Sequence, residues 1–97
     1  MAKILVVDDN EQNCELVKDI LSAWGHNVYK AYQGLNAIKY ALSASPDIIL
    51  LDVMLPGMNG FEVCHELKNN PQTQNIPIIM LSVLTDVEDR IRGLKVG

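Results

Sequence analysis

The stretch DIILLDVMLPGMNG, residues Asp47 to Gly60, decides the fold that the sequence predicts. Ile48 to Leu51 form an uninterrupted apolar run that leads directly into Asp52, and a turn at Pro56-Gly57 follows. Such a run is typical of a strand buried on both faces of a parallel sheet, although periodicity alone also permits a buried helix. Asp52 then lies at the carboxyl end of the strand, where open α/β sheets bind ligands. It is therefore the first candidate for chemistry.

Apolar runs and stretches of helical spacing alternate along the rest of the chain. We expect further strands at 3–7, 28–31 and 76–81, and helices at 10–24, 34–44, 59–67 and 86–96. Alternating strands and helices imply an α/β protein with a doubly wound, mostly parallel sheet and right-handed crossovers. With the strand order 2-1-3-4, the first helix covers one face and the other helices cover the opposite face. Trp24 and Phe61, at helical core spacing, are expected to pack in the interior.

Composition places the chain among small acidic domains. Its 97 residues are 48% hydrophobic and 21% charged, which suits one domain, residues 1–97. The net charge of −4 argues against a nucleic-acid or anionic-membrane surface. Neither a membrane-spanning run nor a signal peptide is recognisable, which predicts a cytoplasmic protein. Cys14 and Cys64 lack metal-ligand spacing and are expected to be reduced packing residues.

Acidic side chains follow two of the predicted strands. Asp8 and Asp9 end the run 3–7, and Asp52 ends the central run. Because these strands are expected to be neighbours, the three carboxylates converge, and each close pair costs on the order of 1 kcal/mol in repulsion when well solvated. Mg²⁺, which prefers oxygen ligands and keeps several waters, relieves this repulsion. An acid pair at a strand end is equally well explained as charge complementing a helix N-terminus, and the third acid favours the metal site.

A carboxylate beside a bound metal can act as a nucleophile toward a phosphoryl donor. Asp52 suits this role because it ends its strand singly and precedes the loop 53–58, whose backbone N–H groups could hold phosphoryl oxygens. Ser82, at the end of the run 76–81, could donate a hydroxyl hydrogen bond. Without the acids, a hydroxyl that forms a turn at the strand end would be the better interpretation of Ser82.

Four motifs spread over the chain resemble those of one family. They are ILVVDDN at 4–10, LLDVMLPGMNG at 50–60, IPIIMLS at 76–82 and GLKVG at 93–97. Together they resemble the receiver domain of two-component response regulators, a CheY-like domain with a flavodoxin-like fold. The resemblance implies a phosphoacceptor module of signal transduction, with a histidine kinase or a phosphotransfer protein as the donor. It implies no enzyme activity beyond magnesium-dependent self-phosphotransfer and autodephosphorylation.

The resemblance also assigns roles to individual residues. It implies that Asp52 is the phosphoacceptor and that Asp9 and Asp52 bind Mg²⁺ together with the backbone carbonyl of Met54. Asp8 would contribute to the metal mainly through water. Ser82 would be the switch hydroxyl.

The sequence departs from the family pattern in ways that affect function. Receivers usually continue into a fifth strand, a conserved lysine and a fifth helix, and we expect this chain to lack that last unit and the lysine. Lys95 lies in the predicted fourth helix and cannot replace it. Val83, whose backbone would contact the phosphoryl group, stands where the family usually has a smaller alanine. A scaffold that no longer switches is therefore an alternative function.

Two further expectations follow. Without a fifth unit the strand at 76–81 becomes an exposed edge, which predicts a homodimer, strand exchange or a covering partner. A metal-dependent phosphatase would also use an aspartyl phosphate, but it would usually place a general acid where this chain has Met54. That function ranks last.

Overall fold

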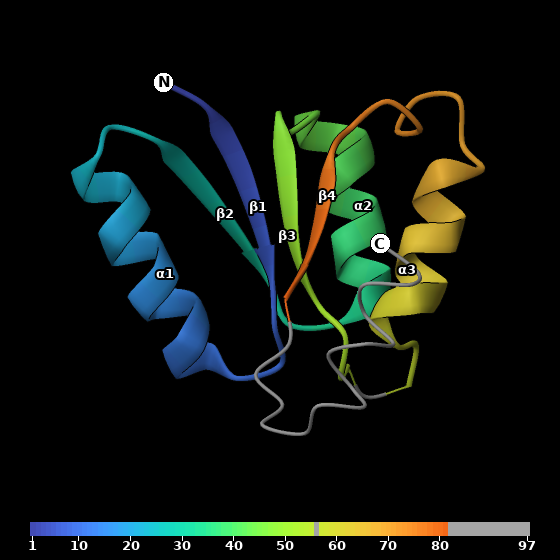
Figure 1. Cartoon of the computed structure of the whole chain (residues 1–97), viewed down its shortest axis with the longest axis horizontal. Coiled ribbons are helices and arrows are strands. Elements are labelled where there is room, and N and C mark those ends of the chain that lie inside the picture. The colour runs from blue at the N-terminus through green and yellow to red at the C-terminus, as the bar shows by residue number, and fades with distance from the viewer. Residues whose placement is uncertain (56, 82–97) are drawn as a thin grey trace.

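Four parallel strands form the sheet of this protein, in the order β2-β1-β3-β4 (Figure 1). The computed structural model describes residues 1–55 and 57–81. Its elements are β1 (Lys3–Val7), α1 (Glu11–Ala23), β2 (Asn27–Ala31), α2 (Gly34–Ala44), β3 (Ile48–Asp52), α3 (Gly60–Lys68) and β4 (Ile78–Leu81). The predicted α/β class and strand order are confirmed. Pro56, Ser82, Val83, Lys95 and the helix predicted at 86–96 lie outside the described residues.

The helices lie on both faces of the sheet. In Figure 1, α1 lies apart from α2 and α3, which are close together beyond β4. Successive side chains of a strand point to opposite faces, and β1 accordingly supplies two separate apolar clusters. Ile4 and Val6 pack with Cys14 of α1, whereas Leu5 and Val7 belong to the other cluster. That larger cluster also holds residues of α2, α3 and β3, namely Ala37, Ala41, Ile49, Leu51, Val63 and Leu67.

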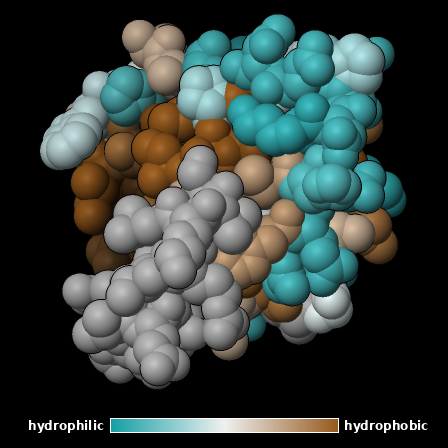
Figure 2. All heavy atoms as spheres, turned by 45° about the vertical axis from the view of Figure 1, so that its right-hand side comes forward, coloured by the Kyte–Doolittle hydropathy of each residue, from teal (hydrophilic) through white to brown (hydrophobic). Residues whose placement is uncertain are grey.

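One core prediction on α1 is wrong. Trp24 is 72% exposed, and Leu16 and Ile20 are also exposed. Helical spacing groups these residues with the buried Cys14, but they lie to one side of the part of the helix surface that is buried. Trp24 is in addition the C-cap residue, at the end of the helix. Figure 2 shows that hydrophobic side chains gather on one part of the surface beside a hydrophilic region. Several large apolar side chains of the described residues are therefore exposed, among them Leu16, Ile20 and Trp24.

The last described strand is shorter than the sequence suggested. The prediction began it at Ile76, but the N–H of Ile76 donates to the carbonyl of Thr73 at 3.0 Å and so closes a turn. Pro77 has no N–H to give to a sheet, although its carbonyl accepts from Ile49. Regular pairing therefore begins at Ile78. None of the helices in the described part of the chain is long and apolar enough to cross a membrane.

Candidate metal and phosphoryl site

Three acids meet at one edge of the sheet, as the order of the strands requires. Val7 of β1 pairs with Leu51 of β3, so the residues that follow them lie side by side. Asp8, Asp9 and Asp52 each offer one carboxylate oxygen, and these oxygens all lie within 4.8 Å of one another. The predicted convergence of the three side chains is thus present in the structure.

Asp52 is the buried member of this group. Its side chain lies at the end of β3 and the residue is only 3% exposed. Burial, followed by the negative charges of Asp8 and Asp9, raises the pKa of Asp52 to about 6, although a hydrogen bond from the Met54 N–H opposes this rise. That N–H donates to Oδ1 of Asp52 at 3.1 Å. A cation at this site would lower the cost of ionising Asp52.

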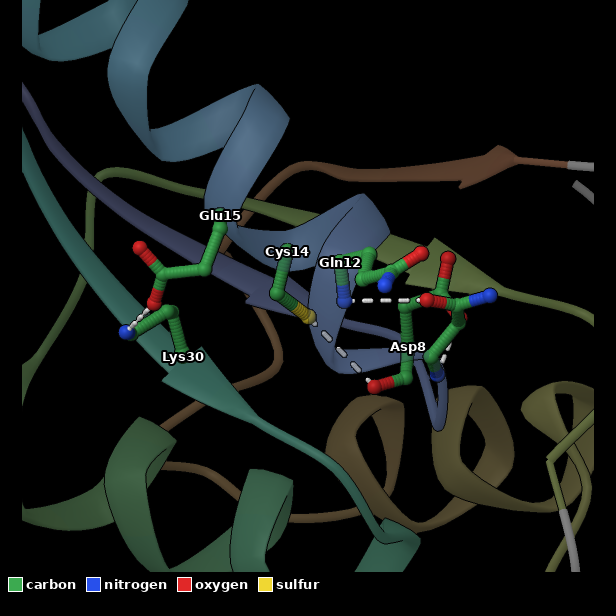
Figure 3. A network of polar contacts seen from close by, with 6 residues as sticks. Asp8, Gln12, Cys14, Glu15 and Lys30 are labelled. Carbon is green, nitrogen blue, oxygen red and sulfur yellow. Dashed lines mark hydrogen bonds and ion pairs between the residues drawn. The ribbon is translucent and has the colours of Figure 1, made fainter.

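Asp8 is held by the start of α1. The backbone N–H of Asn10 donates to its Oδ1 at 2.9 Å, and the side-chain amide of Asn13 donates to its Oδ2 at 3.3 Å. The thiol of Cys14 donates to its carbonyl oxygen at 3.4 Å, and Figure 3 shows this thiol pointing to Asp8 from α1. Burial, with the charge of Asp8 as a second cause, raises the pKa of the thiol to about 11, so it remains a donor at neutral pH.

Neither Asn13 as a partner of Asp8 nor the contact of Cys14 with the Asp8 carbonyl was predicted from the sequence. Asn13 could have been recognised from its position, because it places a side-chain amide in the first turn of the helix that follows Asp8 and Asp9. The helix itself begins where it does because Asn10 caps it, accepting from the N–H groups of Gln12 and Asn13. The same cap brings the first turn of α1 against Asp8.

The loop after Asp52 is closed by backbone contacts. The N–H of Val53 donates to the carbonyl of Leu81 at 3.1 Å, and the N–H of Gly60 donates back to the carbonyl of Val53 at 3.0 Å. Asn59 then caps α3 through a capping box with Glu62, at the start of the helix predicted at 59–67. Of the other predicted site residues, Met54 has a half-exposed side chain, and Ser82 and Val83 lie outside the described part of the chain.

The donor set fits a hard divalent cation. All three side chains are carboxylates, and because Asp9 is exposed and Asp52 is buried, the group extends from the surface into the interior. Within residues 1–55 and 57–81, the one ion pair joins Lys30 to Glu15, and no lysine or arginine there neutralises the acids. Mg²⁺ prefers oxygen ligands in this arrangement and retains waters at its open positions. The acids therefore suit Mg²⁺ better than a metal that needs histidine or cysteine.

Comparison with known proteins identifies the family. The family model of the response regulator receiver domain matches residues 4–97. The chain belongs to this family. This receiver domain is similar to response regulator PleD of Caulobacter vibrioides, with 48% identity over 99% of the chain and 21% of PleD. It is also similar to the DNA-binding dual master transcriptional regulator RpaA of Synechocystis sp., with 37% identity over 100% of the chain and 40% of RpaA.

Solved receiver structures have the same fold. Chemotaxis response regulator CheY4 of Vibrio cholerae is 36% identical with a TM-score of 0.87, and the match covers 100% of this chain and 81% of that one. The N-terminal domain of a response regulator receiver protein from Methanoculleus marisnigri is 30% identical with a TM-score of 0.85, over 100% and 80% of the two chains. This receiver domain therefore has the family fold, and it spans less than half of the length of PleD and of RpaA.

Proposed function

We propose that this receiver domain accepts a phosphoryl group on Asp52, with Mg²⁺ held by the acidic group, from a phosphohistidine of a histidine kinase or a phosphotransfer protein. One observation carries the proposal. A single buried carboxylate, Asp52, lies within 4.8 Å of two further carboxylates at the carboxyl end of the sheet. Family membership supports the general phosphoacceptor role, and the specific residues and the donor are our proposal.

The contacts of the three acids favour Asp52 as the nucleophile. Its Oδ1 accepts from the Met54 N–H, which fixes the carboxylate and leaves Oδ2 to form the new bond. Asp8 has both oxygens in hydrogen bonds with Asn10 and Asn13, which suits a group that stays in place during the reaction. Asp9 is exposed and accessible to a hydrated ion. The three carboxylates are thus differentiated by burial and by hydrogen bonding.

In the proposed reaction, Oδ2 of Asp52 attacks phosphorus and forms an O–P bond as the P–N bond of the phosphohistidine breaks. The imidazole leaves with the electron pair and takes a proton from solvent, and Asp52 becomes an acyl phosphate. Asp9, Asp52 and the Met54 carbonyl would hold Mg²⁺, with Asp8 acting through water. The bound ion supplies positive charge that offsets the carboxylates and the phosphoryl oxygens.

The chain's remaining groups would stabilise the transferred phosphoryl group and communicate its presence. Backbone N–H groups of the loop after Asp52 can donate to phosphoryl oxygens. The Ser82 hydroxyl and the Val83 backbone remain predicted donors that lie outside the described residues. The added charge at the ends of β1 and β3 would shift a conformational equilibrium that a partner senses. The chain performs self-phosphotransfer and autodephosphorylation but turns over no other substrate.

A small phosphodonor tests this proposal directly. Incubation with acetyl phosphate and Mg²⁺ should add the mass of one phosphoryl group to the wild-type chain and none to Asp52→Asn. Asp47→Asn is the matched control, because Asp47 lies before the opposite end of β3 and its carboxylate accepts from the N–H of Lys3. It should gain the phosphoryl mass like the wild type. A gain that persists in Asp52→Asn, or no gain in the wild type, contradicts the proposal.

The same experiment decides between a switching receiver and a scaffold. Within residues 1–55 and 57–81, no lysine or arginine side chain is paired with the three acids. This observation favours the scaffold. A scaffold would bind Mg²⁺ without gaining the phosphoryl mass. Phosphorylation of Asp52 excludes this second candidate.

We also propose that the chain forms a homodimer or exchanges strands through β4, the outer strand of the described sheet. Ile79 of β4 is 48% exposed, and Leu16, Ile20 and Trp24 of α1 are exposed as well. Homodimer formation or strand exchange would bury such side chains. A stable monomer at micromolar concentration in analytical ultracentrifugation contradicts this proposal.

A further inference from the structure

We infer that Asn13 is a positioning residue that orients Asp8 for the metal ion, an inference that rests on the proposed magnesium-dependent function. The Nδ2 group of Asn13 donates to Oδ2 of Asp8 at 3.3 Å, and this contact is partly buried. The backbone N–H of Asn13 is itself held by Oδ1 of Asn10 at 3.1 Å. The amide is therefore presented to Asp8 from a capped helical turn.

The contacts of Asp8 give Asn13 a role that no neighbour shares. The Asn10 bond to Asp8 comes from the backbone, and the Cys14 bond ends on the Asp8 carbonyl, so both mainly fix the turn between β1 and α1. Within the described residues, the Asn13 bond is the one from a side chain to the Asp8 carboxylate. By holding Oδ2, the Asn13 amide fixes the direction in which the Asp8 carboxylate points.

An amide is the appropriate donor for such a role. A lysine or arginine at position 13 would orient Asp8 but would also cancel the negative charge that attracts a cation. The neutral amide of Asn13 holds the carboxylate and leaves its charge intact. Without this donor, the carboxylate of Asp8 could rotate, and part of the metal's binding free energy would be spent on ordering it.

Calorimetric titration with Mg²⁺ at neutral pH tests the inference without measuring phosphorylation. Asn13→Ala should weaken Mg²⁺ binding about 10-fold, the lower end of the range for the loss of an outer-shell hydrogen bond, because Asp8 itself acts on the ion through water. Asn13→Leu should weaken it similarly, although leucine favours the helix more than asparagine does. Asn13→Gln, which keeps the amide on a longer side chain, should restore part of the affinity.

Two control variants separate positioning from stability. Gln12→Ala changes the neighbouring residue. Gln12 contacts the cap residue Asn10 through its backbone N–H and not through its side chain, so this variant should leave the affinity for Mg²⁺ unchanged. Asn70→Ala removes another asparagine side chain that makes one hydrogen bond, because its Oδ1 accepts from the backbone N–H of Gln72 at 2.9 Å in the loop after α3. It should lower the melting temperature in EDTA without changing the affinity for Mg²⁺. Asn13→Leu should show the opposite result, an unchanged melting temperature and a weaker affinity.

A kinetic measurement provides an independent readout. With acetyl phosphate, Asn13→Leu should need about 10-fold more Mg²⁺ for half the maximal phosphorylation rate, and the rate at saturating Mg²⁺ should stay within about twofold of the wild type. If the wild type binds no Mg²⁺, the proposed function itself fails. If the wild type binds Mg²⁺ and both Asn13→Ala and Asn13→Leu bind it equally well, only the role of Asn13 is refuted.

Discussion

Gly60 lies directly against the main chain of Asp52. A Cβ atom placed on Gly60 would overlap the carbonyl oxygen of Asp52 and would lie 2.8 Å from the Cα of Val53. Both contacts are with backbone atoms, which cannot rotate away as the end of a side chain can. The first residue of α3 is thus packed against the end of β3, and this close approach to Asp52 requires that position 60 has no side chain.

Gly60→Ala should therefore destabilise the domain by about 3 kcal/mol and weaken its binding of Mg²⁺, because the end of β3 must move to admit the methyl group. Chemical denaturation measures the first effect and calorimetric titration the second. Gly25→Ala is the matched control, since Gly25 has a φ of +90° but no atom within 4 Å of the added methyl group. It should cost about 1–2 kcal/mol through its backbone conformation alone and leave Mg²⁺ binding unchanged. Equal effects of the two variants would show that the contact with Asp52 is unimportant.

Asp52→Asn should stabilise the protein in the absence of divalent ions. Burial and the neighbouring acids raise the pKa of Asp52 from 3.8 to about 6, so keeping this group ionised at neutral pH costs the folded state up to roughly 3 kcal/mol. Asparagine removes the charge and keeps an oxygen that can accept from the Met54 N–H. Urea denaturation in EDTA at pH 7 measures the gain. Asp47→Asn should show no such gain, and a less stable Asp52→Asn would contradict the buried-charge account.

The raised pKa of Asp52 also determines the direction in which the free energy of unfolding changes with pH. Between the ordinary value of 3.8 and the folded-state value of about 6, the folded protein binds a proton at Asp52 that the unfolded chain has released. The contribution of Asp52 to the free energy of unfolding therefore falls as the pH rises from about 4 to about 6, and is level above that range. Denaturation at a series of pH values in EDTA should show this fall as a difference between wild type and Asp52→Asn. A constant difference would exclude the raised pKa.

The sequence predicted the parts of this protein that depend on the chain's regular patterns. Asp8 and Asp52 could be placed together because each ends an apolar run, and parallel strands align their carboxyl ends. The helix predicted at 10–24 ends close to the expected position, at Ala23 with Trp24 as its C-cap, and Gly25 follows with a φ of +90°. Such features follow from residues close in sequence and from the rules of sheet topology.

Features set by tertiary geometry could not be predicted in the same way. Helical spacing shows that α1 has an apolar side but does not locate the centre of its buried arc, and Trp24 was therefore assigned to the core. The contact between Asn13 and Asp8 depends on the angle at which α1 leaves β1, which no local pattern specifies. The roles of Ser82 and Val83 remain predictions from the family resemblance.

Mg²⁺ should stabilise the wild-type domain, and the effect should depend on Asp52 and on pH. At a free concentration of 100 times the dissociation constant, binding to the folded state alone adds about 2.7 kcal/mol to the free energy of unfolding. Metal ligands must be deprotonated, so the gain should be larger at pH 7 than at pH 5, below the pKa of about 6 for Asp52. Thermal denaturation with and without Mg²⁺ at both pH values measures this dependence.

Two variants complete this test. Asp9→Asn removes an exposed member of the acidic group and should lose most of the stabilisation by Mg²⁺. Asp19→Asn removes an exposed acid of α1 that is not part of the group, and should retain it. Because both substitutions remove one negative charge, a difference between them reports coordination and not the general attraction of a cation to an acidic protein. Equal stabilisation of both variants by Mg²⁺ would show that the ion binds elsewhere.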